Sequence, residues 1–361
     1  MEEINSTVSA IIENATEQSN KTTRSLKGTP TGLAVAYSGL IIMSILPICY
    51  GSFRSFYRTQ KSKVETMNSK DALMFPLVAS GALFSLYIVI KLLSKEYLNL
   101  LLAGYFFFLG TGCLTSILDP VIRPIFIGIL PKTCYQFLFI QKKDEKKETL
   151  NDIEFDYITL MALALSAAFN VWYFIKKHWI ANNILGLAFA STGVELLQLN
   201  SVQTGCILLG GLFFYDIFWV FGTDVMVTVA TSFEAPIKLI FPVDIIEKGI
   251  NSTNYAMLGL GDIVIPGIYI ALLLRFDLSS NKGSKAYFYN GLVAYIIGLI
   301  VTVAVLLLFK AAQPALLYLV PACIGSTILT ALVKGQLKEL FAYKDEDQGK
   351  GSEDVSEKKD N

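Results

Sequence analysis

The stretch Leu208-Leu-Gly-Gly-Leu-Phe-Phe-Tyr-Asp-Ile-Phe-Trp219 places one carboxylate, Asp216, in the middle of an apolar run. A second carboxylate, Asp262, lies in Met257-Leu-Gly-Leu-Gly-Asp-Ile-Val-Ile-Pro266. An apolar run of about 20 residues predicts a membrane-spanning helix, and an ionisable side chain at that depth is costly. The two aspartates are therefore the first candidates for chemistry.

The composition of the whole chain agrees with a membrane protein, since 53% of the 361 residues are hydrophobic. There are 30 basic and 30 acidic residues, so the net charge indicates no nucleic-acid partner. The five cysteines form no C-x-x-C pair, and the single histidine, His178, follows two lysines in a predicted loop. We therefore expect no disulfide framework, no metal site, no cofactor and no histidine catalysis.

Apolar runs of roughly 17 to 25 residues predict nine membrane-spanning helices. They cover residues 33–50, 72–93, 97–118, 157–175, 182–199, 203–227, 255–275, 287–309 and 313–333. The fifth is the least apolar, but its small residues suit close packing between helices. We expect an all-α polytopic protein in four parts: a tail at 1–32, five helices at 33–199, four helices with both aspartates at 200–334, and a disordered tail at 335–361.

The charges of the loops predict the orientation of the helices. The first 32 residues lack the pattern of a removable signal peptide, so the first helix is expected to be an uncleaved anchor. With the N-terminus outside the cytosol, 20 of the 30 Lys and Arg residues fall in cytosolic segments. The positive-inside rule therefore favours a lumenal N-terminus and a cytosolic C-terminus.

Short motifs in the two tails agree with that orientation. Three N-x-S/T sequons, at Asn5, Asn14 and Asn20, lie in the N-terminal tail and would be lumenal glycosylation sites. Lys358 and Lys359 form a dilysine near the C-terminus that resembles the retrieval signal of endoplasmic-reticulum membrane proteins. We therefore expect a multi-pass protein of the endoplasmic-reticulum membrane.

The two aspartates are expected at matching depth. Asp216 lies 13 residues after Gln203, and Asp262 lies 13 residues before Arg275, so each is about 20 Å from the same membrane boundary. Two carboxyl groups that face each other share one proton, so that one can act as a base and the other as an acid. The predicted helices around them hold no basic partner. The residues alone favour a hydrolase and a proton-coupled carrier equally.

Glycine and proline residues mark two further segments. Gly259 and Gly261 flank Leu260 directly before Asp262, which predicts a locally unwound helix that admits water or, equally, close helix packing. The segment Gln313-Pro-Ala-Leu316 opens the ninth predicted helix, where a proline is ordinary. The mixed segment 233–248 is expected either as an amphipathic gate over the site or as an ordered loop.

Together, Tyr215-Asp216, Gly259-Leu-Gly-Asp262 and Pro314-Ala-Leu316 resemble the signature of the intramembrane aspartyl proteases, which include presenilin and signal peptide peptidase. Longer stretches, such as Trp179-Ile-Ala-Asn-Asn183 and Phe233-Glu-Ala-Pro-Ile-Lys238, resemble signal peptide peptidase. The similarity covers most of residues 30–343. The predicted orientation also matches signal peptide peptidase rather than presenilin.

The resemblance implies a presenilin-like fold and an aspartic endopeptidase. Asp216 and Asp262 would be the catalytic pair. The residues that would shape the active site or receive substrate are Tyr215, Gly259, Leu260, Gly261, Gln313, Pro314, Ala315 and Leu316. Of these, Tyr215 would either hydrogen-bond beside Asp216 or only pack there. The implied substrates are membrane-spanning segments of type II orientation, chiefly signal peptides left after signal peptidase cleavage.

Two other functions remain as alternatives at this point. A proton- or ion-coupled transporter would use the same carboxylates, although neither the hydropathy nor the motifs show an internal repeat. A chaperone or an adaptor of the endoplasmic-reticulum degradation machinery would use the C-terminal tail, and that role could coexist with catalysis. Beyond the substrate and the lipid bilayer, the possible partners are a second copy of the chain and this degradation machinery.

Overall fold

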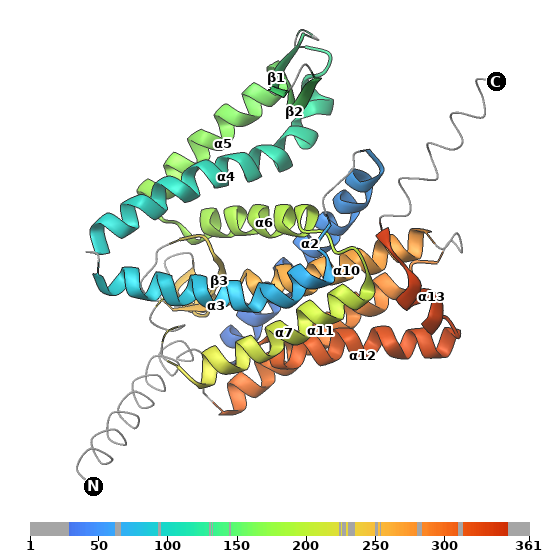
Figure 1. Cartoon of the computed structure of the whole chain (residues 1–361). Coiled ribbons are helices and arrows are strands. Elements are labelled where there is room, and N and C mark those ends of the chain that lie inside the picture. Colours follow the sequence, from blue (N-terminus) through green and yellow to red (C-terminus); the bar gives the residue numbers. More distant parts are fainter. Residues whose placement is uncertain are drawn as a thin grey trace, which may run out of the picture.

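The computed structural model of the chain has the architecture of a helical bundle (Figure 1). The structure describes residues 29–61, 66–92, 95–129, 131, 133–143, 146–223, 225, 229, 235–249, 252, 254–279, 284–309 and 313–345. Asn5, Asn14, Asn20, Lys358 and Lys359 lie outside these residues, so the expected glycosylation and retrieval signals stay predictions.

Long helices make up most of the described chain. They are α2 (Pro30–Lys61), α3 (Ser69–Leu92), α4 (Lys95–Phe126), α5 (Tyr157–Lys176), α6 (Trp179–Leu196), α7 (Val202–Phe221), α10 (Gly261–Ser279), α11 (Ala286–Phe309) and α12 (Leu316–Lys334). Two short helices are α9 (Ile245–Lys248) and α13 (Leu337–Ala342). Each of the nine long helices overlaps one of the predicted spans, and the polytopic helical fold is confirmed.

Length and hydropathy single out seven of these helices as candidate membrane spans, namely α2, α3, α4, α5, α7, α11 and α12. The fifth and seventh predicted spans correspond to α6 and α10, which are helical but are not among the seven. Nine spans thus fit the described helices, although the hydropathy criterion alone does not give that number.

The helix α10 lies at the centre of the bundle. It contacts α2, α6, α7, α11 and α12 among the described elements. Thirteen of its 19 residues are buried, including the whole run Ile268–Asp277. On one side α6 separates this core from the α4–α5 pair, and on the other side α7, α11 and α12 lie together (Figure 1).

Two antiparallel hairpins interrupt the helical pattern. The hairpin of β1 (Cys134–Lys143) and β2 (Lys146–Asp156) connects α4 to α5. The charge-rich stretch 141–148 lacks apolar periodicity, yet it contributes residues to both of these strands. In β1 and β2 the paired backbone supplies the order that the side chains do not predict.

The second hairpin corrects the prediction for the seventh span. β3 (Lys238–Pro242) pairs with β4 (Tyr255–Gly259), and α10 begins only at Gly261. The predicted helix at 255–275 is therefore wrong for residues 255–259. Part of the segment 233–248, which was expected as an amphipathic gate or an ordered loop, is the strand β3.

The C-terminal tail is ordered further than expected. A disordered segment was predicted from residue 335, but α13 and the residues up to Asp345 are described. Asp345 forms an ion pair with Arg275 at 2.7 Å, and both side chains are about 2% exposed or less. Arg275 also donates to Ser55 Oγ and to the carbonyl of Leu199. The segment after α13 is thereby fixed to α10, α2 and the start of α7.

Candidate active site

Asp216 belongs to α7, and its carboxylate contacts the first residue of α12. Its side chain lies on α7 and is 6% exposed. The backbone N–H of Leu316, the first residue of α12, donates a hydrogen bond to Asp216 Oδ2 at 3.0 Å. The first N–H groups of a helix have no partner within the helix, and the helix dipole favours negative charge there. This contact brings the expected Asp216 and Pro314-Ala-Leu316 motifs together across 100 residues of sequence.

Asp262 lies in the first turn of α10, directly after the β4 strand. A Cβ atom added at Gly259 would be 3.3 Å from Asp262 Oδ2, so the glycine allows this carboxylate to approach the backbone of β4. The chain changes from strand to helix at Leu260, whose N–H donates to the carbonyl of Ile237. The unwinding expected around the glycines is thus a strand that ends beside the carboxylate.

The two carboxylates lie in the same region of the bundle, because Asp216 accepts a hydrogen bond from Leu316 and the preceding Ala315 lines one pocket together with Asp262. Among the described residues, no Lys, Arg or His forms an ion pair with either of them. Without a cation to neutralise them, two close carboxyl groups favour the state that shares one proton. Such a state would supply an acid and a base at one site.

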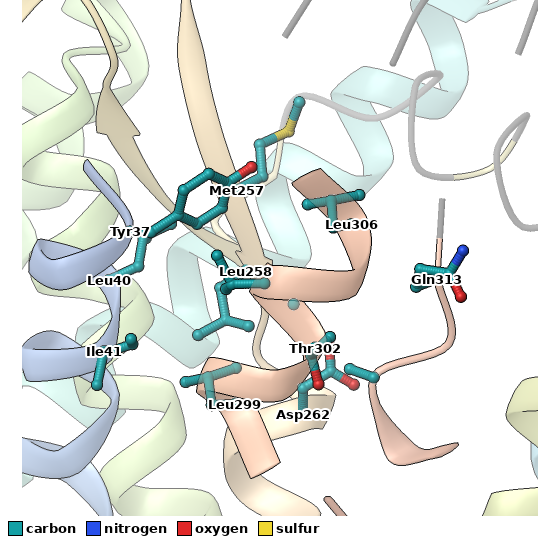
Figure 2. A pocket seen from close by; sticks show the side chains of 13 residues that line it. Tyr37, Leu40, Ile41, Met257, Leu258, Asp262, Leu299, Thr302, Leu306 and Gln313 are labelled. Carbon is teal, nitrogen blue, oxygen red and sulfur yellow. The ribbon is translucent and has the colours of Figure 1, made fainter. Parts of the chain in front are cut away.

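A pocket of about 230 Å³ opens beside Asp262. Figure 2 shows Asp262 and Thr302 at one end of it and Tyr37 and Met257 towards the other. The remaining lining residues are Leu40, Ile41, Leu258, Gly259, Leu299, Val303, Leu306, Gln313 and Ala315. The lining is mainly apolar with a single carboxylate, which suits an apolar side chain held next to a reactive group.

The other expected site residues take different places. Gln313 and Ala315 line the pocket, whereas Pro314 and Leu316 are buried at the start of α12. The hydroxyl of Tyr318 donates to Gln313 Oε1 at 3.2 Å. Tyr215 is half-buried, and its ring lies 6.3 Å from that of Trp219, as in a packing role.

Leu260 and Gly261 join the strand to the helix without lining the pocket. The Leu260 side chain packs against the core of the bundle. Gly261 is exposed, and nothing lies within 4 Å of a Cβ atom added there. These two residues therefore shape the approach of the chain to Asp262.

Sequence reasoning missed two groups of residues near the site. One is the wall of the pocket that comes from α2 and α11, since Tyr37 and Thr302 look like ordinary residues of apolar helices. The other is the amide pair Asn182 and Asn183 of α6, which bonds to β3. Two adjacent buried amides in an apolar helix must find partners, and this requirement was the available signal.

Comparisons with known proteins identify the family. The signal peptide peptidase family model matches residues 59–347. The chain is 54% identical over 330 residues to signal peptide peptidase from Mus musculus and to that from Homo sapiens. Each alignment covers 90% of this chain and 87% of the relative. The chain belongs to the signal peptide peptidase family.

The chain is also similar to a nematode protein and to a solved structure. Intramembrane protease 2 from Caenorhabditis elegans is 50% identical over 214 residues, covering 55% of this chain and 46% of that protein. Among solved structures, a presenilin family intramembrane aspartate protease matches 82% of this chain and 95% of its own, with 17% identity and a TM-score of 0.41. As a family member, the chain is a multi-span membrane protein and an intramembrane aspartic protease.

Proposed function

We propose that this signal peptide peptidase family protein hydrolyses peptide bonds within type II membrane-spanning segments, chiefly signal peptides left after signal peptidase cleavage. The relatives named signal peptide peptidase support this substrate class. We further propose that it acts in the endoplasmic-reticulum membrane with a lumenal N-terminus and a cytosolic C-terminus. The loop charges, the three N-terminal sequons and the dilysine support this placement.

In the proposed reaction, Asp216 and Asp262 share one proton and hold the attacking water between them. The ionised carboxylate removes a proton from the water, and the oxygen bonds to the scissile carbonyl carbon. The protonated carboxyl group gives its proton to the carbonyl oxygen, which forms a neutral diol. The C–N bond then breaks as the carboxyl group that took the water proton gives it to the leaving amine. The other carboxylate removes a proton from the diol, which becomes a carboxylic acid, and the pair again holds one proton. Two observations support this arrangement: Asp216 accepts a hydrogen bond from the first residue of α12, and Asp262 lines the pocket.

A helical substrate must unwind before water can reach its carbonyl groups. We propose that it binds as an extended strand along backbone near Gly259–Gly261 or Pro314–Leu316. The strand β4 supports the first of these places, because it ends at Gly259 and its residues Met257 and Leu258 line the pocket. Peptides with N-methyl groups at the pairing positions would then bind more weakly than unmethylated peptides of the same sequence. Equal binding would contradict this part of the proposal.

The decisive experiment is cleavage of a signal-peptide substrate by purified protein in detergent. We expect the wild-type protein to cleave it, and Asp216→Ala and Asp262→Ala each to lose at least about 100-fold in rate, because each removes an acid–base group. A control substrate with the opposite membrane orientation tests the type II preference. Cleavage that persists in either variant would remove the proposed pair, and inactivity of the wild-type protein would reject the substrate class.

A further inference from the structure

Two adjacent side chains of α6, Asn182 and Asn183, occupy one edge of the β3–β4 sheet. Both are buried, at 6% and 4% exposure. Asn183 Nδ2 donates to the carbonyl of Ile240 at 2.7 Å, and the N–H of Ile240 donates to Asn183 Oδ1 at 2.9 Å. This pair of bonds satisfies the backbone of Ile240 as a neighbouring strand would.

A third bond extends the same edge. Asn182 Nδ2 donates to the carbonyl of Lys238 at 2.8 Å, two residues before Ile240 on β3. Alternate residues of a strand direct their backbone groups to the same side. Gly186, one turn further along α6, allows the close approach, since a Cβ atom there would be 2.9 Å from Leu239 Cδ2. The outer edge of β3 is therefore closed by the helix.

The bonds between α6 and the outer edge of β3 determine which backbone groups of β4 are left unpaired by β3. Ile240 lies opposite Met257, and Lys238 lies opposite Gly259. Because Ile240 and Lys238 direct carbonyl groups towards α6, their partners on β4 direct backbone groups away from β3. Met257 is 54% exposed, and both Met257 and Gly259 line the pocket that contains Asp262. Among the residues that the structure describes, none bonds to the outer backbone groups of Met257 and Gly259, so this edge of β4 is open beside the pocket of Asp262.

We propose that Asn182 and Asn183 are positioning residues for the substrate: they anchor β3 to α6, so that β4 presents its free edge in a fixed register beside Asp262. This inference rests on the proposed function, in which the substrate adds a strand to β4. The amides touch neither the substrate nor the reacting atoms. Their effect reaches the reaction through the backbone of the sheet.

The test measures how strongly the pairing of the substrate with β4 depends on the bonds from Asn182 and Asn183 to β3. Each enzyme cleaves a single-span substrate and the same substrate with an N-methyl group at the residue expected to pair with Met257. The enzymes are the wild type, Asn183→Ala and Asn170→Ala. Asn170 is a matched control, because it is a fully buried amide that bonds to Thr111 and to the carbonyl of Ser166, away from the sheet.

For the wild type and Asn170→Ala, we expect the N-methyl group to lower kcat/KM about fivefold, as for the loss of one backbone hydrogen bond. For Asn183→Ala, we expect a raised KM, an N-methyl effect below about twofold and a shift of the cleavage position. A small transition-state mimic without a peptide backbone should bind the wild type and Asn183→Ala equally. Asn182→Ala, which removes one of the three amide bonds to β3 and leaves both bonds to Ile240, serves as the second variant if Asn183→Ala does not fold.

The outcomes separate this inference from the proposed function. If the N-methyl group has no effect on the wild type, the strand-addition part of the proposed function fails, and the inference fails with it. If the N-methyl effect is the same in all enzymes, strand addition stands and the positioning role of the amides is wrong. Loss of affinity for the small mimic in Asn183→Ala would also overturn the inference, because it would indicate a general disruption of the site.

Discussion

The helices α3 and α10 differ in hydropathy and in burial, in opposite directions. α3 is among the seven candidate spans, yet only Ala72 and Ile90 of its 24 residues are buried. α10 is not among the seven, yet 13 of its 19 residues are buried, and it carries Asp262 and Arg275. In this pair of helices, hydropathy selects the one with the exposed surface, whereas the helix that carries Asp262 is surrounded by protein. A polar residue is tolerated where neighbouring helices satisfy it.

The largest expected effect is at the end of α10. Arg275→Gln leaves the carboxylate of Asp345 without its cation at 1% side-chain exposure. Removal of one partner from a buried ion pair costs about 3–5 kcal/mol of the free energy of unfolding. On α3, Lys91→Gln changes only a contact with the Tyr87 ring and should cost less than about 0.5 kcal/mol. Thermal unfolding in detergent measures both variants, and equal shifts in Tm would break the comparison.

A smaller effect is expected where α7 crosses α10. A Cβ atom at Gly205 would lie 2.7 Å from the ring of Tyr269, which is fully buried. Gly205→Ala should therefore cost about 1–3 kcal/mol by overpacking. It should also lower cleavage, because it displaces the helix of Asp216 from that of Asp262. Both the unfolding free energy and the cleavage rate should be measured.

Gly81 of α3 supplies the control for Gly205, since nothing lies within 4 Å of a Cβ atom there. Gly81→Ala should be neutral or should stabilise the protein by up to about 1 kcal/mol through helix propensity. Its cleavage rate should equal that of the wild type. A larger loss for Gly81→Ala than for Gly205→Ala would show that the two helices do not differ as described.

Apart from the control variants, the smallest effect is expected at the more exposed ion pair of Asp156 and Arg123, whose side chains are 21% and 38% exposed. Burial raises the pKa of Asp156, but bonds from Thr159 and Arg123 outweigh it and lower the pKa from 3.8 to about 2. The stabilisation is thus present above pH 3.8 and is lost as the pH falls through 2.

Asp156→Asn should consequently destabilise the protein by less than about 1 kcal/mol at pH 7. The difference from the wild type should shrink as the pH falls from 5 towards 2. Unfolding at a series of pH values checks this. If the difference in unfolding free energy grew at low pH, its sign would contradict a lowered pKa. If Asp156→Asn lost as much stability as Arg275→Gln, exposed and buried ion pairs would not differ as described.

The sequence predicted those parts of the fold that local patterns determine. The nine apolar runs became helices, and the motifs around Asp216 and Pro314–Leu316 met in space, as the contact with Leu316 shows. Helix periodicity and hydropathy were sufficient for the helices, while the family resemblance was needed to connect the motifs. Asp216 lies within α7 and Asp262 lies in the first turn of α10, and their matching depth in the membrane stays a prediction.

The parts that the sequence did not predict depend on distant partners. Residues 255–259 are apolar and precede a helix, and five residues cannot distinguish a strand from a helix by periodicity. Their strand partner, β3, and the amides that close β3 come from elsewhere in the chain. The polar side chains of Asn182 and Asn183 lowered the hydropathy of the fifth predicted span. The same side chains bond to the backbone of β3 and fix the sheet to α6.

The most direct test of the account is a cryo-EM map of the protein bound to a transition-state mimic with a hydroxyl group at the scissile position. The account predicts that this hydroxyl oxygen lies within hydrogen-bonding distance of both Asp216 and Asp262. It also predicts that the peptide arm of the mimic runs along β4. A hydroxyl group that contacts only one carboxylate, with the other directed elsewhere, would contradict the shared-proton site.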